Sequence, residues 1–587
     1  DTVNRSRAEV PRRIMALPED IQELQSRIGI TDEFSRSLET HPVFRHVSRR
    51  SGGDGGRMCI AVSSQLYLLS EKSKFSDVYM IDLSQYYAHK KLSKADASHR
   101  FPGYHLVTRQ PIPAGNHIST NRDCNMLLIW GPTTCDVVTL PVRNRRFIGE
   151  KSSRGSEETI GEIVCQTATV FRDPVNGVVQ ILRAAFHPMS SVHVLVLTND
   201  GQLRMYKVGR KKAEAIYHDI PPKVTHFYFN KNSEGWGAFT AFLSATDGHI
   251  YRLCPIIPRG CLLPSPTLHS MFALARTKEV NEFLAPKASR QRYLRWISEL
   301  EKVWVPVKSE GSGLGSRVSR GGGEEKTKED EGKAESSQFV RAAIREPLAL
   351  SSNTVPYGPI ISVPDYREPQ QPGTAPPEDQ APVVLALSVC PSRSSNREKK
   401  LKDDASAAEQ VGELTVLVVA FGVVLGMYVG QKEMLPPPPQ GKKGEPKGKF
   451  TEDFIVVERF QTGFGTISHL LPDRFPHMVI AASAFGALVI RMPWLLGLIS
   501  PNLRESGEEG LGEGLEALGG DTGVEYVALM QGSGALSQEG LLGCGVISGQ
   551  LIGRYVVMLA GEGGRDVCVR MPKQSGPDEY FGEDGEE

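Results

Sequence analysis

The sequence predicts an all-β fold, a seven-bladed β-propeller that carries a helical-hairpin insertion and several disordered loops. Two observations predict it: seven hairpin-like segments of one style recur along the 587 residues, and clear copies are spaced like propeller blades. In each copy an apolar run meets a short turn, usually with a glycine, and a second apolar run follows. Repetition of one β unit is typical of propellers, and propellers mostly bind other proteins.

The seven hairpins are spread over the whole chain. Two looser copies lie at 58–70 and 126–142, and five clear copies lie at 193–208, 239–256, 415–429, 478–493 and 555–572. Gly201 and Gly248 are 47 residues apart, close to the roughly 40–45 residues of a four-stranded blade. Between Gly248 and Gly422 the spacing is 174 residues, which predicts a large insertion.

The turns and the second strands of the hairpins follow a shared pattern. Glycine reaches the positive φ that tight hairpins require, and the expected turns are Asp200-Gly201, Asp247-Gly248, Phe421-Gly422 and Phe485-Gly486. Four second strands set an arginine among apolar residues, at positions 204, 252, 491 and 570. We expect these arginines to face solvent or to bond loop carbonyls rather than to bind a partner.

The spacing divides the chain into a propeller and its additions. Residues 1–40 are predicted to be a flexible N-terminal segment, 41–575 the propeller, and 576–587 an acidic tail. The insertion is placed at 262–382. Within it, residues of about 266–306 are predicted to be helical, 308–340 disordered because they lack apolar side chains, and 364–382 Pro-rich and extended.

Composition and motifs give no positive sign of catalysis. Lys plus Arg equals Asp plus Glu, so the formal net charge of zero gives no reason to expect nucleic acid as the main partner. The nine cysteines are scattered singly, as expected of buried reduced thiols. No metal-binding motif, phosphate loop or nucleophile elbow occurs. We therefore expect no enzyme activity, no cofactor, no metal site and no catalytic residue.

One apolar stretch, Leu414–Val429, is long enough to raise the question of a membrane span. It is shorter than the roughly 20 residues that a spanning helix needs. It is also rich in β-branched valine and interrupted by Gly422 and Gly426. The stretch therefore predicts a buried hairpin.

The helical part of the insertion supplies the candidate partner-binding residues. Apolar side chains in its second helix recur at steps of three and four residues. The stripe over 287–304 can serve as an interaction surface or can pack onto the side of the propeller, and one helix can do both because it has more than one face. The candidate residues are Phe272, Phe283, Tyr293, Trp296 and Leu300.

Two segments carry a resemblance to a known family. The segment GWGAFTAFLSATDGHIYRLCPIIPRG at 235–260 resembles the propeller nucleoporins of the cytoplasmic face of the nuclear pore, the eighty-two kilodalton nucleoporins of fungi and the eighty-eight kilodalton nucleoporins of animals and plants. AFHPMSSVHVLVLTNDGQLRMYKV at 185–208 is similar to the preceding blade of that family. HPVF at 41–44 resembles the start of its propeller. Family members continue into long coiled coils, and no sustained heptads occur here.

The resemblance implies a structural scaffold of the nuclear pore complex at the cytoplasmic face of the nuclear envelope. The implied partners are a nucleoporin with Phe-Gly repeats and a nucleoporin with an autoproteolytic C-terminal domain, in an assembly needed for mRNA export and nucleocytoplasmic transport. The implied docking elements are the helices at 266–306 and the loops at 430–450 and 500–540. Neither direct nucleic-acid binding nor membrane insertion is expected.

Two other functions stay open on the residues alone. The repeats also fit a generic propeller adaptor for protein–protein interaction in another cytosolic complex. A propeller enzyme or a membrane protein would need a polar central site or an inserted span.

Overall fold

The structure is a computed structural model whose described part covers most of the expected hairpins. It describes residues 41–43, 57–62, 65–71, 75–83, 102–115, 117–140, 160–173, 178–230, 233, 235–276, 287–307, 339–344, 354, 356–362, 381–389, 414–422, 424–430, 454–461, 467–472, 478–483, 486–492, 495, 525–531, 541–549, 553–560 and 566–570. The predicted N-terminal segment 1–40, the acidic tail and nearly all of the ranges 308–340 and 364–382 lie outside these residues.

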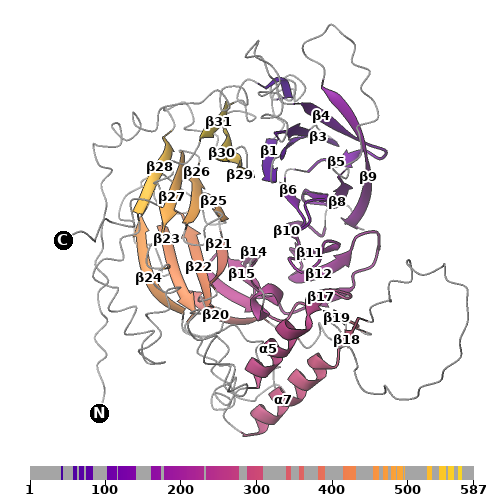
Figure 1. Ribbon diagram of the computed structural model, residues 1–587, viewed down its shortest axis with the longest axis vertical. Helices are drawn as coiled ribbons and strands as arrows, with labels where there is room; N and C mark the ends of the chain where they lie inside the picture. Colours follow the sequence, from indigo (N-terminus) through magenta and orange to yellow (C-terminus); the bar gives the residue numbers. More distant parts are fainter. Residues whose placement is uncertain are drawn as a thin grey trace, which may run out of the picture.

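Seven blades stand in a ring, which confirms the seven-bladed propeller (Figure 1). The first strand of each blade lies closest to the centre and contacts the first strand of the next blade. In ring order these inner strands are β1, β6, β10, β14, β21, β25 and β29, and β29 lies beside β1. The ring therefore closes by contact between its first and last described blades.

The first two blades share one continuous nine-stranded sheet. Blade 1 contains β1 (Arg57–Val62), β2 (Gln65–Glu71), β3 (Phe75–Asp82) and β4 (Gly103–Thr108), with the short β5 (Ile112–Pro113) paired to β3. Blade 2 contains β6 (His117–Thr120), β7 (Met126–Trp130), β8 (Thr134–Thr139) and β9 (Gly161–Arg172). The long β9 joins the blades because one half pairs parallel to β4 and the other antiparallel to β8.

The remaining five blades are antiparallel sheets. Blade 3 contains β10 (Ile181–Phe186), β11 (His193–Thr198), β12 (Gln202–Lys207) and β13 (Ala215–Tyr217). Blade 4 contains β14 (Val224–Phe229), β15 (Ala241–Ala245), β16 (His249–Leu253) and β20 (Tyr357–Ser362). Blade 5 contains β21 (Val383–Val389), β22 (Leu414–Phe421), β23 (Val424–Gly430) and β24 (Phe454–Gln461).

Blades 6 and 7 complete the ring. Blade 6 contains β25 (Ile467–Pro472), β26 (Met478–Ser483), β27 (Gly486–Arg491) and β28 (Glu525–Gln531). Blade 7 contains β29 (Leu541–Gly549), β30 (Gly553–Ala560) and β31 (Asp566–Arg570). Six of the seven predicted hairpins are the second and third strands of their blades; in blade 1 the hairpin is the first and second.

The stretch weighed as a membrane span is a hairpin. Its residues form β22 and β23, which pair antiparallel from Val416↔Val429 to Phe421↔Val424 and are almost wholly buried between neighbouring blades. Among the described residues, no helix has the length and hydropathy required to cross a bilayer.

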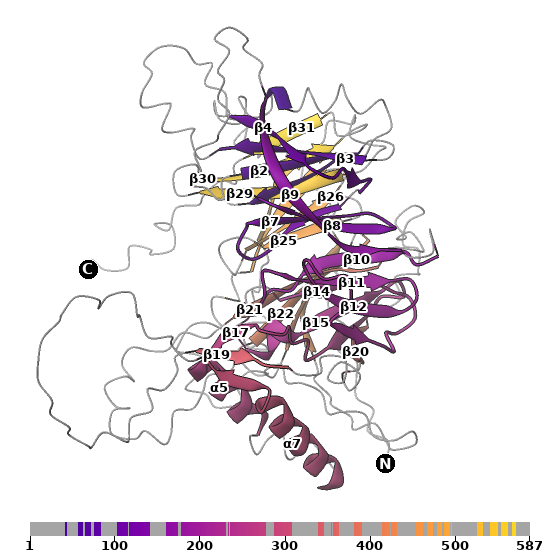
Figure 2. The same ribbon diagram turned by 90° about the vertical axis from the view of Figure 1, so that its right-hand side faces the viewer.

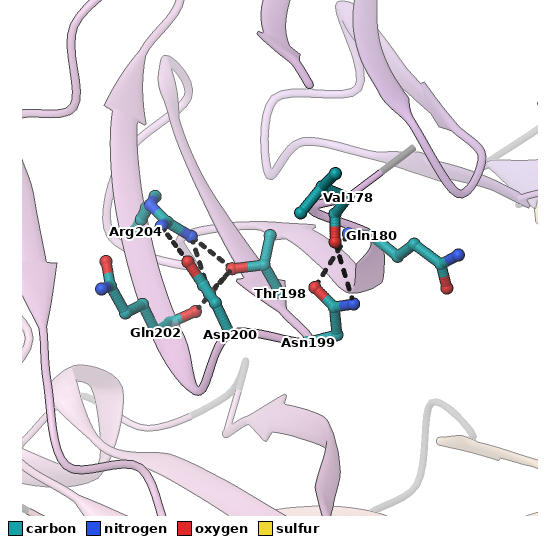
Figure 3. A network of polar contacts seen from close by, with 7 residues as sticks. All are labelled: Val178, Gln180, Thr198, Asn199, Asp200, Gln202 and Arg204. Atoms are coloured by element: carbon teal, nitrogen blue, oxygen red, sulfur yellow. Dashed lines mark hydrogen bonds and ion pairs between the residues drawn. The ribbon is translucent and has the colours of Figure 1, made fainter. Parts of the chain in front are cut away.

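The hairpin of blade 3 shows why the sequence folds into this unit. Gly201 has φ of 71° and takes the left-handed conformation at the turn. The Thr198 hydroxyl donates to the Asp200 carboxylate at 2.5 Å, and Arg204 pairs with that same carboxylate (Figure 3). Asn199 pairs with Gln180 through its backbone N–H and its side chain, both at 2.9 Å. The turn is thus tied to the blade that it belongs to.

The second-strand arginines are not uniformly exposed. Arg204 forms the partly exposed ion pair of the turn, as expected for a surface position. Arg252 is fully buried, which corrects the expectation of a solvent-facing side chain. Its guanidinium carbon lies 5.0 Å from the ring centroid of Tyr357, the residue paired with it on β20. A cation over an aromatic face is stabilised inside the sheet.

The fourth strand of blade 4 comes from within the range drawn for the insertion. The chain leaves the blade after β16 and returns as β20, inside 262–382. The structural addition therefore interrupts blade 4 between its third and fourth strands. Spacing alone does not show this, because β20 is a short strand far along the chain from the hairpin that it completes.

Candidate partner-docking site

The addition to blade 4 is a pair of helices standing on a small sheet. Its helices are α5 (Ser265–Ala275) and α7 (Lys287–Glu301), and its three-stranded sheet contains β17 (Leu262–Pro264), β19 (Phe339–Ala342) and β18 (Trp304–Pro306) in that order. Figures 1 and 2 show both helices projecting beyond the ring. The helices are the most protruding regular elements of the described chain, which makes them the candidate docking site.

The sequence accounts for where α5 begins and for which face of each helix is buried. Pro264 precedes α5 and Pro266 lies in its first turn, where the missing N–H of proline costs nothing. Both helices turn one apolar stripe inward at intervals of three, four and seven residues. On α5 the stripe contains Leu268, Met271, Phe272 and Ala275, and on α7 it contains Tyr293, Trp296, Ile297 and Leu300.

A short 3-10 helix, η1 (Trp236–Phe239), is the platform for these stripes. The Trp236 indole N–H donates to the Met271 carbonyl at 2.9 Å, and its ring meets Phe272 edge-on at 5.3 Å. Phe239 makes a similar contact with Trp304, at 6.1 Å between centroids. The motif at 235–260 therefore supplies the surface of the propeller against which the helical insertion packs.

The sequence-predicted partner-binding residues converge on one apolar cluster. Phe272, Tyr293, Trp296 and Leu300 all belong to it, with exposed fractions of 1%, 0%, 7% and 1%. Phe283 lies outside the described residues. The structure thus brings four of the five together, and it places their side chains against the propeller rather than on an open surface.

The helical range predicted over 266–306 differs from the structure at its end. Helix α7 ends at Glu301, and Trp304 begins strand β18, which pairs with β19. Trp304 continues the helical spacing of the stripe, so periodicity alone assigned it to the helix. Residues 339 and 340, which were predicted to be disordered, lie in β19.

The two helices are braced against each other and against the ring. Arg276, which follows α5, forms an ion pair with Glu301 at the end of α7. At the base of the insertion, the backbone N–H of Arg259 donates to the Glu214 carboxylate of blade 3 at 2.9 Å. Partial burial raises the pKa of Glu214, but the close contact with His193 and the hydrogen bond from Arg259 outweigh it and hold the pKa below its usual value. A carboxylate at this joint therefore stays ionised.

His187 links blade 3 to the segment that leads into the insertion. The backbone N–H of Met189 donates to Nδ1 of His187 at 3.0 Å, so Nε2 carries the proton and donates to the Ile256 carbonyl at 2.9 Å. Burial lowers the pKa of His187 to about 3, although its bond to Ile256 opposes the shift. The imidazole is neutral at physiological pH and acts as a structural hydrogen-bonding group.

The outward face of α7 is charged. Its exposed positions are Arg290, Gln291, Arg295 and Glu299, and Lys302 follows the helix. Three of these five side chains are cations, so the face favours an acidic partner surface. Sequence reasoning selected the apolar stripe and passed over this face. The signal was present, since an apolar stripe on one side of a helix leaves the opposite side to solvent.

The thiol of Cys261, in the cluster beneath the helices, is buried. Burial raises the pKa of the Cys261 thiol to about 12, so this sulfur is protonated and is a poor nucleophile. The described residues hold no group of histidine, cysteine and carboxylate side chains suited to a metal ion. What the site offers is a rigid helix pair with a charged outer face.

Fold and insertion together define the class: a seven-bladed propeller whose fourth blade carries a helical hairpin. A chain in the crystal structure of the Chaetomium thermophilum Nup82 NTD-Nup159 TAIL-Nup145N APD complex is similar, with a TM-score of 0.58 at 14% identity over 89% of this chain and 96% of that one. A chain of the yeast Nup82-Nup159-Nup116 complex is similar with a TM-score of 0.51 at 10% identity, over 88% and 98%.

Sequence comparison points to the same group of proteins. Nucleoporin nup82 of Schizosaccharomyces pombe is 28% identical over 170 residues, 26% of this chain and 20% of that protein. The nuclear pore complex protein NUP88 of Arabidopsis thaliana is 26% identical over 113 residues, 17% and 14% of the two chains. No protein-family profile matches. The aligned parts span at most about a fifth of these relatives' lengths. Over these aligned parts the chain is similar to the Nup82/Nup88 nucleoporins.

Proposed function

We propose that this chain is a structural scaffold of the nuclear pore complex at the cytoplasmic face of the nuclear envelope. It anchors partner nucleoporins needed for mRNA export and nucleocytoplasmic transport, and it has no enzyme activity. The observation that carries the proposal is the helical hairpin seated on blade 4 by the motif at 235–260. This is the segment of the sequence that most resembles the family.

The partners proposed are those implied by the family. One is a nucleoporin with Phe-Gly repeats and the other is a nucleoporin with an autoproteolytic domain. The two similar structures are heterotrimers of Nup82 with Nup159 and with Nup145N or Nup116, which supports this choice. Within the chain, the four buried candidates Phe272, Tyr293, Trp296 and Leu300 serve docking indirectly, by holding α5 and α7 in a fixed orientation.

Charge reversal on the outer face of α7 tests whether a partner docks there. A variant with Arg290→Glu and Arg295→Glu reverses two exposed charges without touching the apolar cluster. If an acidic partner surface docks there, its affinity falls by about tenfold or more and depends strongly on salt. The matched control, Lys211→Glu with Lys212→Glu, reverses two exposed charges on blade 3 and leaves the affinity unchanged.

The binding assay uses the purified chain with each proposed partner, and localisation provides a second readout. A tagged chain should give a signal around the nuclear rim. Failure of the intact chain to bind either partner, together with a diffuse signal, would contradict the scaffold role and favour a generic propeller adaptor. If the α7 double variant and the blade 3 control both bind as well as the natural chain, the scaffold role stands, but the docking surface lies elsewhere than on the outer face of α7.

A further inference from the structure

The inner strands of four blades share one irregularity in the same place. On β29 it falls between Leu541 and Gly543, and the other three strands carry polar side chains at the shifted position. The antiparallel register shifts between Ile181 and Arg183 on β10, between Val224 and His226 on β14, and between Ile467 and His469 on β25. Each shift inserts an extra residue after the first position of the strand and re-aims the third. The third positions hold Arg183, His226 and His469, so three blades present a nitrogen-bearing side chain at one equivalent level of the ring.

Contacts on blades 3 and 4 join two of these side chains. The guanidinium carbon of Arg183 lies 5.5 Å from the ring centroid of Tyr228. His226 stacks on the same tyrosine, with centroids 6.2 Å apart and planes within 10°. The Thr225 hydroxyl is 3.0 Å from Nδ1 of His226. Arg183 and His226 are therefore positioned around one aromatic ring.

Blades 2 and 6 contribute two more imidazoles. His117, on the inner strand β6, stacks on Trp130 with centroids 3.8 Å apart. On β25, the Ser468 hydroxyl donates to the Ala482 carbonyl at 3.3 Å and lies 2.9 Å from Nδ1 of His469. The Ser468 hydroxyl has one proton, which it donates to Ala482, so its oxygen accepts a hydrogen bond from Nδ1–H of His469. The other ring nitrogen of neutral His469, Nε2, is therefore unprotonated and has a free lone pair.

These four side chains, Arg183, His117, His226 and His469, form an electrostatic unit that we call the channel cluster. Burial, with the positive charge of Arg183 as the second cause, lowers the pKa values of the three histidines to about 3, 4 and 4, in chain order. Among the described residues, no carboxylate acts on the pKa of any of the three. The cluster has a fixed cation and no described counter-charge.

The Arg183 guanidinium has an unused hydrogen-bond donor. Its Nε is buried and makes no hydrogen bond within the described part of the chain. All four residues are partly exposed rather than fully buried. A buried guanidinium N–H without an acceptor is costly, and an oxyanion is the ligand that satisfies it best.

We propose that the channel cluster binds a small, multiply charged oxyanion of the phosphate or sulfate class. The Arg183 guanidinium supplies the charge and paired N–H donors, and the imidazoles from blades 2, 4 and 6 supply further donors around the anion once they are protonated. The site is independent of the proposed scaffold role, since it lies on the inner strands of the ring and the helices project from its rim (Figure 2).

Binding should be linked to proton uptake. A dianion beside the histidines favours their charged form and opposes the effect of Arg183. Protonation turns Nε2 of His469 from an acceptor into a donor. The titratable groups facing the site from the surrounding described strands are His117 on β6, His226 and Tyr228 on β14, and His469 on β25. Affinity for sulfate, which keeps its charge, should therefore increase from pH 8 to pH 6.

The test is calorimetric titration of the full 587-residue chain with sodium phosphate and with sodium sulfate, at constant ionic strength in chloride. We expect saturable binding of both at millimolar or lower concentration. Arg183→Gln should weaken it by roughly tenfold or more, as loss of a charge-assisted hydrogen bond does. Arg210→Gln, an exposed arginine on the same blade, is the matched control and should leave the affinity unchanged.

Further variants keep the test decisive if Arg183→Gln fails to fold. His469→Gln should reduce the protons taken up with sulfate, measured by repeating the titration in buffers of different ionisation enthalpy. His218→Gln, on an exposed histidine, should not. Two results would overturn the site: no saturable heat with either anion for the natural chain, or the same affinity and proton uptake in the channel variants as in their controls.

Discussion

Single residues at the hairpin turns fix the geometry of each blade. Gly248 has φ of 82° between β15 and β16. Side chains with a Cβ rarely adopt this conformation, and β-branched ones least of all. The Asp-Gly pattern predicted this turn because it is a local property of two adjacent residues.

We expect Gly248→Val to destabilise the chain by about 2 kcal/mol or more, because valine must hold a left-handed backbone. Gly248→Asn, which tolerates that region, should cost much less. The measurement is the free energy of unfolding from urea titrations of the two variants beside the natural chain. Equal stability of the valine variant would show that the turn does not hold this conformation.

Trp296 distinguishes packing from partner binding. It is 7% exposed within the cluster beneath the helices, and its indole N–H has no hydrogen-bond partner in the described chain. Trp296→Ala should cost roughly 3–5 kcal/mol through the cavity that it leaves. Trp296→Phe should cost far less, because it keeps most of the apolar volume and removes an unsatisfied donor.

Thermal melts read beside partner affinities separate the two roles of Trp296. Loss of stability in the alanine variant, with affinity recovered in the phenylalanine variant, supports the structural role. Unchanged melting of the alanine variant, with lost affinity, would instead make Trp296 a direct binding anchor.

At the scale of elements, the insertion depends on a few contacts that return the chain to the ring. The buried Ser244 hydroxyl on β15 donates to the Pro382 carbonyl at 2.6 Å, just before β21. This bond joins residues 138 positions apart. It ties blade 4 to the start of blade 5, across the whole insertion.

Ser244→Ala should cost about 1–3 kcal/mol, because it leaves a carbonyl without its donor in a buried place. Ser298→Ala on α7 is the control and should change stability by less than about 0.5 kcal/mol, since that position is half-exposed on a helix. Chemical denaturation of both variants measures the difference. A loss no larger than that of the control would mean that the bond does not hold the returning chain.

At the scale of the whole molecule, neutral histidines in four blades make stability depend on pH. His117, His187, His226 and His469 have folded pKa values of about 3 to 4, all depressed below the ordinary value, chiefly by burial. Their contribution to stability is complete above the unfolded pKa of about 6.5. It is lost as the pH falls below that value, because the unfolded chain then binds protons that the folded chain does not.

We expect the free energy of unfolding in chloride buffer to decrease between pH 6.5 and 4.5. Each histidine contributes up to about 1.4 kcal/mol per pH unit. His187→Gln can still donate to the Ile256 carbonyl. It should make the fall in unfolding free energy with pH less steep, by the slope that uptake of up to one proton on unfolding gives, and His218→Gln should leave the slope unchanged. The measurement is the urea midpoint across this pH range. A decrease of the same steepness in both variants would show that His187 is not a neutral buried group.

The repeated unit of this protein can be recognised in short stretches of its sequence. Apolar runs broken by short turns, usually with a glycine, encode hairpins locally, so the seven hairpins, the buried hairpin at 414–430 and the two helices of the insertion could all be predicted. The five candidate residues could be found by their helical spacing, and four of them do share one cluster. Periodicity identifies the face of a helix that is apolar.

What those faces contact depends on the tertiary structure. It showed that the helical stripes pack on η1, that Trp304 starts a strand, and that β20 returns through the insertion to cover Arg252. It also brought Arg183, His226 and His469 to one level of the ring. The physical reason is that strand pairing within a blade and packing between blades join residues that are far apart in the chain. No local pattern records which strand completes a sheet or which side chains face the centre of the ring.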